Sequence, residues 1–195
     1  MLNSSNIMII KLGGSLTYSN AIKDCLAIIE QTKLINIVIV PGGGEFANQV
    51  RYAQQVWQFN ESIAHEMAIL AMQQMALLFH GLYPNFQLIK SIRDFSNLMA
   101  NSVPVIWSPI LSELNQANIP ATWEMTSDSL AIWLAIQLHV EQLIVVKSIF
   151  MNSQNYQQLA EQGIVDSLFP QFVQQSSIKP KLIHYSQLKA LLIDN

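Results

Sequence analysis

The sequence feature that most constrains the fold is a pair of short apolar runs that each end in glycine. Residues 8–15 read Met-Ile-Ile-Lys-Leu-Gly-Gly-Ser, and residues 37–44 read Ile-Val-Ile-Val-Pro-Gly-Gly-Gly. Five of the chain's 7 glycines stand at these two places (Gly13, Gly14, Gly42, Gly43, Gly44). Glycine costs backbone entropy and is used where the backbone turns sharply or approaches another group closely. We therefore predict two buried strands whose ends bring backbone N–H groups and Lys11 to a phosphate.

Strand-like and helix-like segments alternate through most of the chain. Apolar runs predict strands at 8–12, 35–40, 86–89, 103–107, 143–147 and 181–185. Helical spacing predicts helices at 20–32, 46–59, 62–80, 94–101, 110–117, 127–138 and 186–192. Stretches rich in Gln and Asn are interpreted as surface loops at 54–60, 152–158 and 171–175. This alternation is typical of an α/β, three-layer αβα sandwich with a mainly parallel central sheet, in which ligands bind at the carboxyl ends of the strands.

Composition narrows the possible partners. The chain is 51% apolar and 12% charged, whereas soluble domains carry roughly 25% charged residues. This bias indicates a large buried sheet or a subunit interface, and we expect a homo-oligomer, either a dimer or a small ring. The formal net charge of −3 argues against a nucleic-acid partner. No apolar run reaches the roughly 18 residues of a membrane span, and residues 1–6 lack a signal-peptide pattern. We therefore expect a cytoplasmic protein with no membrane partner.

Cysteine and histidine give no sign of a metal site. Cys25 stands alone in a helical pattern, which favours a buried structural thiol over a disulfide or metal ligand. The histidines at 80, 139 and 184 have no acidic or cysteine partner at ligand spacing. We therefore expect no metal bound by protein side chains alone.

Two further places carry possible chemistry. Residues 126–131 read Thr-Ser-Asp-Ser-Leu-Ala and open a helix. They form either an ordinary N-cap box or a site in which Asp128 holds cationic side chains beside a phosphoryl group. Lys147 ends an apolar strand, so its side chain either extends to the surface or serves a site. Neither glycine cluster is a Walker loop or a Rossmann fingerprint, and a plain strand-to-helix turn stays open for each.

These motifs, in this order, resemble the amino acid kinase family, which includes acetylglutamate, aspartate, uridylate, carbamate and isopentenyl phosphate kinases. The resemblance covers residues 8–150. It implies an ATP-dependent enzyme that transfers the γ-phosphoryl group to a carboxylate or a phosphate. It also implies one domain over 1–195, with an acceptor-binding half at about 1–120 and a shortened nucleotide-binding half at about 121–195. ATP and Mg²⁺ are the expected cofactors, with Mg²⁺ held mainly by the nucleotide phosphates and water.

A narrower resemblance is to the aminomethylfuranyl-methyl phosphate kinases of methanofuran and methylofuran biosynthesis. It rests on four segments, at 41–51, 64–72, 146–148 and 163–166. It implies that the acceptor is [5-(aminomethyl)furan-3-yl]methyl phosphate and that the product is its diphosphate. The alternatives are an isopentenyl phosphate, uridylate or amino acid acceptor, or a non-catalytic homologue that binds an oxyanion.

The resemblance also implies three sets of site residues. The catalytic set would be Lys11, Asp128 and Lys147, with the two lysines flanking the moving phosphoryl group. The set that binds phosphate or nucleotide would be Gly13, Gly14, Ser15, Ser127 and Ser148. The set that binds the acceptor would be Gly42, Gly43, Gly44, Arg51 and His65.

Several of these assignments leave alternatives open. Arg51 is either a clamp for the acceptor phosphate or a surface arginine. His65 is either a structural histidine or an acceptor contact. Glu61 and Glu66 are candidates for an ammonium group on the acceptor. Three aromatic residues are candidates for its pocket or for ordinary core packing, namely Trp57, Phe59 and Trp107.

Overall fold

The computed structural model of the chain describes residues 7–32, 36–95 and 103–193. Six strands form one sheet in the order β3-β4-β2-β1-β5-β6, and every pair is parallel. The strands are β1 (Ile7–Leu12), β2 (Asn36–Pro41), β3 (Gln87–Ile89), β4 (Val105–Trp107), β5 (Gln142–Lys147) and β6 (Lys181–His184). All six predicted strands are therefore present, and the predicted parallel αβα sandwich is confirmed.

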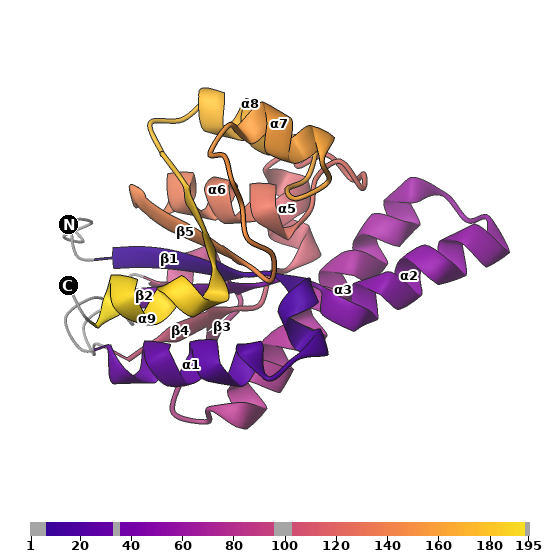
Figure 1. The fold of residues 1–195 in the computed structure, drawn as a ribbon. Coiled ribbons are helices and arrows are strands. Elements are labelled where there is room, and N and C mark those ends of the chain that lie inside the picture. The colour runs from indigo at the N-terminus through magenta and orange to yellow at the C-terminus, as the bar shows by residue number, and fades with distance from the viewer. Residues whose placement is uncertain (1–6, 33–35, 96–102, 194–195) are drawn as a thin grey trace.

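Helices cover both faces of this sheet (Figure 1). One face carries α1 (Ala21–Gln31) and α9 (Leu188–Leu192). The other carries α5 (Leu111–Gln116), α6 (Ser127–Gln137), α7 (Tyr156–Glu161) and α8 (Phe169–Gln174). Side chains of β1 alternate between two apolar cores: Ile9 joins the core that contains α6, and Ile10 joins the core that contains α1. The sheet is thus buried on both sides, as its continuous apolar runs require.

Two helices form a hairpin that projects from the carboxyl edge of the sheet (Figure 1). They are α2 (Gly44–Trp57) and α3 (Glu61–Leu82), and the side chain of Asn60 caps α3 by accepting the N–H of Ile63 at 2.9 Å. On length and composition alone α3 could cross a membrane. In this fold it packs instead against α2 and the strands β2, β3 and β4. The hairpin therefore stands beside the strand ends where the sequence places the glycines.

Parts of the chain differ from the sequence-based expectation. Two Gln-rich stretches expected as loops lie partly in helices: α7 begins at Tyr156, and α8 contains residues 171–174. The third, at 54–60, overlaps the helix expected at 46–59, and α2 runs to Trp57 as that expectation requires. Glutamine is a good helix former, and each short helix buries an apolar anchor, Leu159 in α7 and Phe169 in α8. Of the helix expected at 94–101, residues 96–101 lie outside the described part of the chain.

The connections place a crevice between the ends of β1 and β5. The helix that follows β1 covers one face of the sheet, whereas the helices that follow β5 cover the other. Neighbouring parallel strands whose connections leave to opposite faces open a crevice at their carboxyl ends, where α/β proteins bind ligands. Lys11 and Gly13 stand at one side of this crevice, and Lys147 at the other.

Candidate active site

The two glycine clusters lie against each other at adjacent strand ends. Strands β1 and β2 pair up to Leu12 and Pro41, and the N–H of Gly42 donates to the carbonyl of Leu12 at 2.9 Å. A Cβ atom on Gly14 would stand only 2.7 Å from the backbone nitrogen of Gly44, and a Cβ on Gly42 only 2.7 Å from that of Gly14. Any larger residue would push the two backbones apart, so the shared edge predicted from the sequence requires glycine.

Two of the predicted anion-binding N–H groups are already used within the fold. Gly13 donates its N–H to the carbonyl of Val146 at 3.1 Å, and Gly42 donates to Leu12. These glycines permit the close approach of the strands, and their N–H groups are not available to a phosphate. Of the five glycines, the expectation of anion binding therefore rests on the N–H groups of Gly14, Gly43 and Gly44.

A buried cluster of three charged side chains fills the crevice between β1 and β5. The ammonium of Lys11 lies 2.6 Å from Oδ1 of Asp128, and that of Lys147 donates to Oδ2 at 2.7 Å. The three residues are 3%, 4% and 8% exposed, in chain order. One carboxylate therefore separates two ammonium groups, and the cluster carries a net charge of about +1 in a desolvated place.

Local structure explains how each charge arrives there. Lys11 is near the end of β1 and Lys147 is the last residue of β5, so the parallel register brings both to the same edge. Asp128 stands in the first turn of α6, whose N-cap is Thr126. A carboxylate in this position is favoured by the positive end of the helix dipole. The predicted convergence of these three residues is thus observed.

The cluster perturbs the ionisation of its members. Burial raises the pKa of the Asp128 carboxyl, but the attraction and hydrogen bonds of Lys11 and Lys147 outweigh burial and lower it to about 2. Burial lowers the pKa of the Lys147 ammonium to about 8, against the opposing attraction of Asp128. At neutral pH the carboxylate is ionised and Lys147 keeps its proton, so Asp128 can hold the ammonium group that would attract an anion.

Two cavities open at this edge and share part of their lining. The larger, of about 570 Å³, contains the charged cluster together with Gly13, Ser148 and residues 162–166. The smaller, of about 230 Å³, lies between the glycines and the hairpin. The residues common to both linings are Gly14, Ser15, Arg51, Trp123 and Thr126. Two molecules, one in each cavity, would therefore come into contact beside these shared residues.

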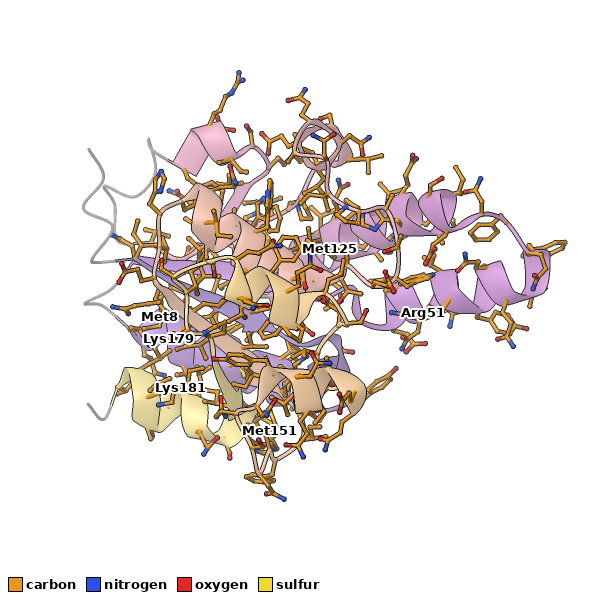
Figure 2. All side chains as sticks on the ribbon, turned by 90° about the horizontal axis from the view of Figure 1, so that it is seen from above. Met8, Arg51, Met125, Met151, Lys179 and Lys181 are labelled. Carbon is orange, nitrogen blue, oxygen red and sulfur yellow. The ribbon has the colours of Figure 1, made fainter. Side chains whose placement is uncertain are left out.

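The smaller cavity is built from both halves of the chain. Its lining includes Gly42, Gly43, Gly44 and His65 from the first half, and Met125, Ser127 and Leu130 from the second. Arg51 comes from the projecting hairpin and Met125 from the body of the molecule (Figure 2). Ser127, expected on the nucleotide side, thus lies at the smaller cavity, whereas Ser148 lies at the larger and donates to Ser15 Oγ at 2.8 Å.

Arg51 is held at the junction by an aromatic ring. Its guanidinium carbon lies 3.7 Å from the ring centroid of Trp123, a cation–π contact. The ring nitrogen of Trp123 donates to Oε1 of Gln54 at 2.7 Å, and its backbone N–H donates to Oε1 of Glu61 at 3.1 Å. These contacts tie the segment before α6 to the hairpin and place a positive charge at both cavities.

Other expected acceptor contacts are distributed differently. His65 lines the smaller cavity and is 4% exposed, and burial lowers the pKa of its imidazole, which keeps the ring neutral. Phe59 is not among the described lining residues, Trp57 is largely exposed, and Trp107 packs in the core. Glu61 accepts the backbone N–H of Trp123 and is not among the lining residues of this cavity. The acceptor pocket therefore gains no support from Trp57, Phe59 or Trp107.

Two features of the site escape the sequence-based reading. Trp123 precedes the Thr-Ser-Asp motif, and no local pattern marks it as a partner of Arg51. At the rim of the smaller cavity, Tyr18 donates its hydroxyl to Oε2 of Glu45 at 2.7 Å, and Asn48 donates to the same hydroxyl at 2.6 Å. Tyr18 and Asn48 both line the cavity, so the Glu45 carboxylate is bonded to two of its lining residues.

Residues 6–150 match the model of the amino acid kinase family. The chain belongs to that family. A curated relative, the [5-(aminomethyl)furan-3-yl]methyl phosphate kinase of Methanocaldococcus jannaschii, is 30% identical over 145 residues. The match covers 72% of this chain and 65% of the relative, which is less than two thirds of the relative's length.

Solved structures of uridylate kinases share the fold of this amino acid kinase family member. The enzyme from Archaeoglobus fulgidus has a TM-score of 0.69 at 16% identity, covering 96% of this chain and 95% of its own. The enzyme from Bacillus anthracis has a TM-score of 0.72 at 13% identity, covering 97% and 93%. The enzyme from Ureaplasma parvum has a TM-score of 0.72 at 15% identity, covering 97% and 95%. At these identities the likeness shows the fold alone.

Proposed function

We propose that this kinase transfers the γ-phosphoryl group of ATP to a small phosphate monoester. The observation that carries the proposal is the buried cluster of Lys11, Asp128 and Lys147, placed beside the junction of two cavities. Phosphoryl transfer needs reactants held in line and positive charge around the moving group, with little other chemistry from the protein. Two lysines fixed by one carboxylate supply that charge.

ATP would occupy the larger cavity. Lys11 and Lys147 would face its phosphates, and the N–H of Gly14 would bind a phosphate oxygen at the edge shared with the acceptor. Mg²⁺ neutralises phosphate charge when it is bound with ATP. The carboxylates of Asp128 and Asp166 in this cavity already hold lysines or hydrogen-bond donors. This arrangement fits a cation carried by the nucleotide phosphates and water.

The transfer itself needs no general base. An oxygen of the acceptor phosphate forms a bond to the γ-phosphorus, while the bond from that phosphorus to its bridging oxygen breaks and ADP keeps the electron pair. A phosphate monoester has its second pKa near 6, so it is already a dianion at neutral pH. Lys11 and Lys147 would stabilise the charge on the transferred group, and Asp128 would hold both in place.

The acceptor would occupy the smaller cavity. Its volume of about 230 Å³ lies below the roughly 300–1,000 Å³ of sites for drug-sized ligands, which favours a compact molecule. Arg51 and the N–H groups of Gly43 and Gly44 would hold the phosphate. The apolar walls at Ile69 and Met72 would accept a ring.

The best candidate acceptor is [5-(aminomethyl)furan-3-yl]methyl phosphate. Support comes from the activity in the name of the M. jannaschii relative and from the Glu45 carboxylate, which is bonded to Tyr18 of the cavity lining. That carboxylate would attract the aminomethyl ammonium of the acceptor. Because ATP and such an acceptor are cytoplasmic metabolites, the proposal places the enzyme in the cytoplasm.

A panel of acceptors tests this function. The purified chain would be given ATP, Mg²⁺ and, in turn, the furanyl phosphate, isopentenyl phosphate, UMP and acetylglutamate. We expect the furanyl phosphate to have a kcat/KM at least roughly tenfold above the others. Glu45→Gln should raise the KM for this acceptor about tenfold and leave the KM for ATP unchanged.

Two other outcomes of the panel would each point to a different function. Faster turnover of a different acceptor would overturn the furanyl assignment and leave a kinase for that acceptor. Nucleotide binding without ATP consumption on any acceptor would favour the non-catalytic homologue that binds an oxyanion.

A further inference from the structure

A second, partly buried carboxylate binds the start of α6 from a distant part of the chain. Asp166 lies between α7 and α8, and its Oδ2 accepts the N–H of Thr126 at 3.0 Å, the N–H of Ser129 at 3.0 Å and the hydroxyl of Thr126 at 2.8 Å. Its Oδ1 accepts the hydroxyl of Ser129. Asp166 thus binds donors on both sides of Asp128.

This carboxylate replaces the local cap of α6. Thr126 is the N-cap residue, yet its side chain makes no capping bond to the helix and donates to Asp166 instead. The N–H of Ser129, the third helical residue, is the donor that an N-cap side chain ordinarily satisfies. Here its acceptor comes from 37 residues further along the chain. The orientation of the first turn of α6 therefore depends on Asp166.

The segment that carries Asp166 also lines the larger cavity. Residues 162–166 line this cavity together with Lys11, Asp128 and Lys147. A main-chain bond strengthens the attachment two residues later, where the N–H of Leu168 donates to the carbonyl of Glu124 at 3.1 Å. The wall of the nucleotide cavity and the start of α6 are thus bound together on both sides of the Thr-Ser-Asp motif.

We propose that Asp166 is a positioning residue that fixes Asp128 between Lys11 and Lys147 by capping α6 from outside the helix. The proposal deepens the phosphoryl-transfer function and rests on it for its kinetic consequences. It assigns no contact between Asp166 and the reacting atoms. A small movement of the first turn of α6 would displace Asp128 and both lysines with it, and displacements of about 1 Å cost up to roughly a hundredfold in rate.

Three variants separate capping from charge and from general stability. Asp166→Ala removes the cap. Asp166→Asn keeps an oxygen for the two N–H groups, removes the charge and turns the oxygen that accepts the Ser129 hydroxyl into an NH₂ donor. Asn155→Ala is the matched control, because the Asn155 side chain caps α7 by accepting the N–H of Gln158 at 3.1 Å, away from the cluster.

We expect a large loss of kcat only in Asp166→Ala. Asp166→Ala should lower kcat roughly a hundredfold, with both KM values changing less than about threefold. Asp166→Asn should recover most of that loss, and Asn155→Ala should keep the wild-type kcat. Wild-type kcat in Asp166→Ala would overturn the proposal. Equal losses in Asp166→Ala and Asp166→Asn, or in Asp166→Ala and Asn155→Ala, would overturn it as well.

A second readout does not depend on activity. The pKa of Lys147 can be followed by NMR with isotopically labelled lysine. The charged groups that face Lys147 are Asp128 from α6, Lys11 from β1 and Asp166. Because the Asp166 carboxylate favours the protonated lysine, Asp166→Asn should lower the pKa of Lys147, and Asn155→Ala should not. Asp166→Ala should lower the pKa of Lys147 further, because the uncapped turn also moves Asp128 away. Equal Lys147 pKa values in Asp166→Ala and Asp166→Asn would overturn the positioning role. This titration stays decisive even if the wild-type protein phosphorylates no acceptor in the panel.

Discussion

At the scale of single residues, the ionisation of Lys147 gives the site a defined pH range. In the free protein the pKa of Lys147 is lowered to about 8 by burial, so the ammonium is present below that pH and lost above it. The acceptor phosphate acts as a dianion above its second pKa of about 6. Both conditions are met only between these two values.

We therefore expect kcat/KM for ATP to fall as pH rises through about 8. This parameter reports ionisations of the free enzyme, and the loss of one positive charge weakens phosphate stabilisation. Lys147→Arg keeps its charge at every accessible pH, so its profile, whatever its absolute rate, should lack this limb. A wild-type profile that stays flat to pH 9.5 would contradict the assignment of Lys147 to the site.

Some of the site residues can be predicted from the sequence because a short local pattern marks each of them. Lys11 and Lys147 each stand at the end of an apolar run, and Asp128 stands in a helix-opening motif. Asp166 and Trp123 could not be found in this way. Asp166 contacts a residue 40 positions away, and Trp123 meets Arg51 only because the hairpin projects over the strand ends. No short-range pattern encodes either contact.

At the scale of elements, the fit of β1 against β2 decides whether the two cavities share an edge. The turns after these strands touch through Gly14 and Gly44, with no room for a side chain. The sequence predicts this edge because glycine is otherwise scarce in the chain. It does not predict α7 and α8, since their glutamine-rich stretches show little apolar periodicity and their burial depends on neighbours such as Leu159 and Phe169.

Gly14→Ala should lower both stability and turnover. The added methyl would meet the Gly44 backbone nitrogen at 2.7 Å, and overpacking of this kind costs typically about 1–3 kcal/mol. Gly81→Ala is the control, because Gly81 lies in α3 and a Cβ atom added there would meet nothing within 4 Å. That change should stabilise by about 0.4–1 kcal/mol. Urea unfolding measures both, and equal stability of Gly14→Ala and the wild type would show that the glycine edge can relax.

At the scale of the whole molecule, α3 leaves an apolar stripe uncovered. Ile63, Leu70 and Leu77 recur every seven residues along its exposed side. This spacing is typical of a helix that pairs with another helix. Together with the low charge of the chain, it supports the proposal of a homo-oligomer in which α3 meets a second copy.

Light scattering tests the oligomer. We expect the wild type to have a mass of at least twice 22.0 kDa at micromolar concentration. The double change of Leu70→Lys and Leu77→Lys should give a folded monomer, because buried lysines would oppose pairing. Ile136→Lys, which adds one positive charge at an exposed apolar residue outside α3, should leave the mass unchanged. A monomeric wild type would refute the proposed interface.

The most direct test of the central claim is the rate of phosphoryl transfer in Lys11→Ala, measured in single turnover with γ-labelled ATP and the best acceptor of the panel. Lys90→Ala, at an exposed lysine, serves as the control. Because Lys11 would supply charge needed most in the transition state, Lys11→Ala should slow transfer by about 10²–10³-fold while the protein stays folded. A folded Lys11→Ala protein that transfers phosphate within about twofold of the wild-type rate would show that the buried cluster is structural and does not carry the reaction.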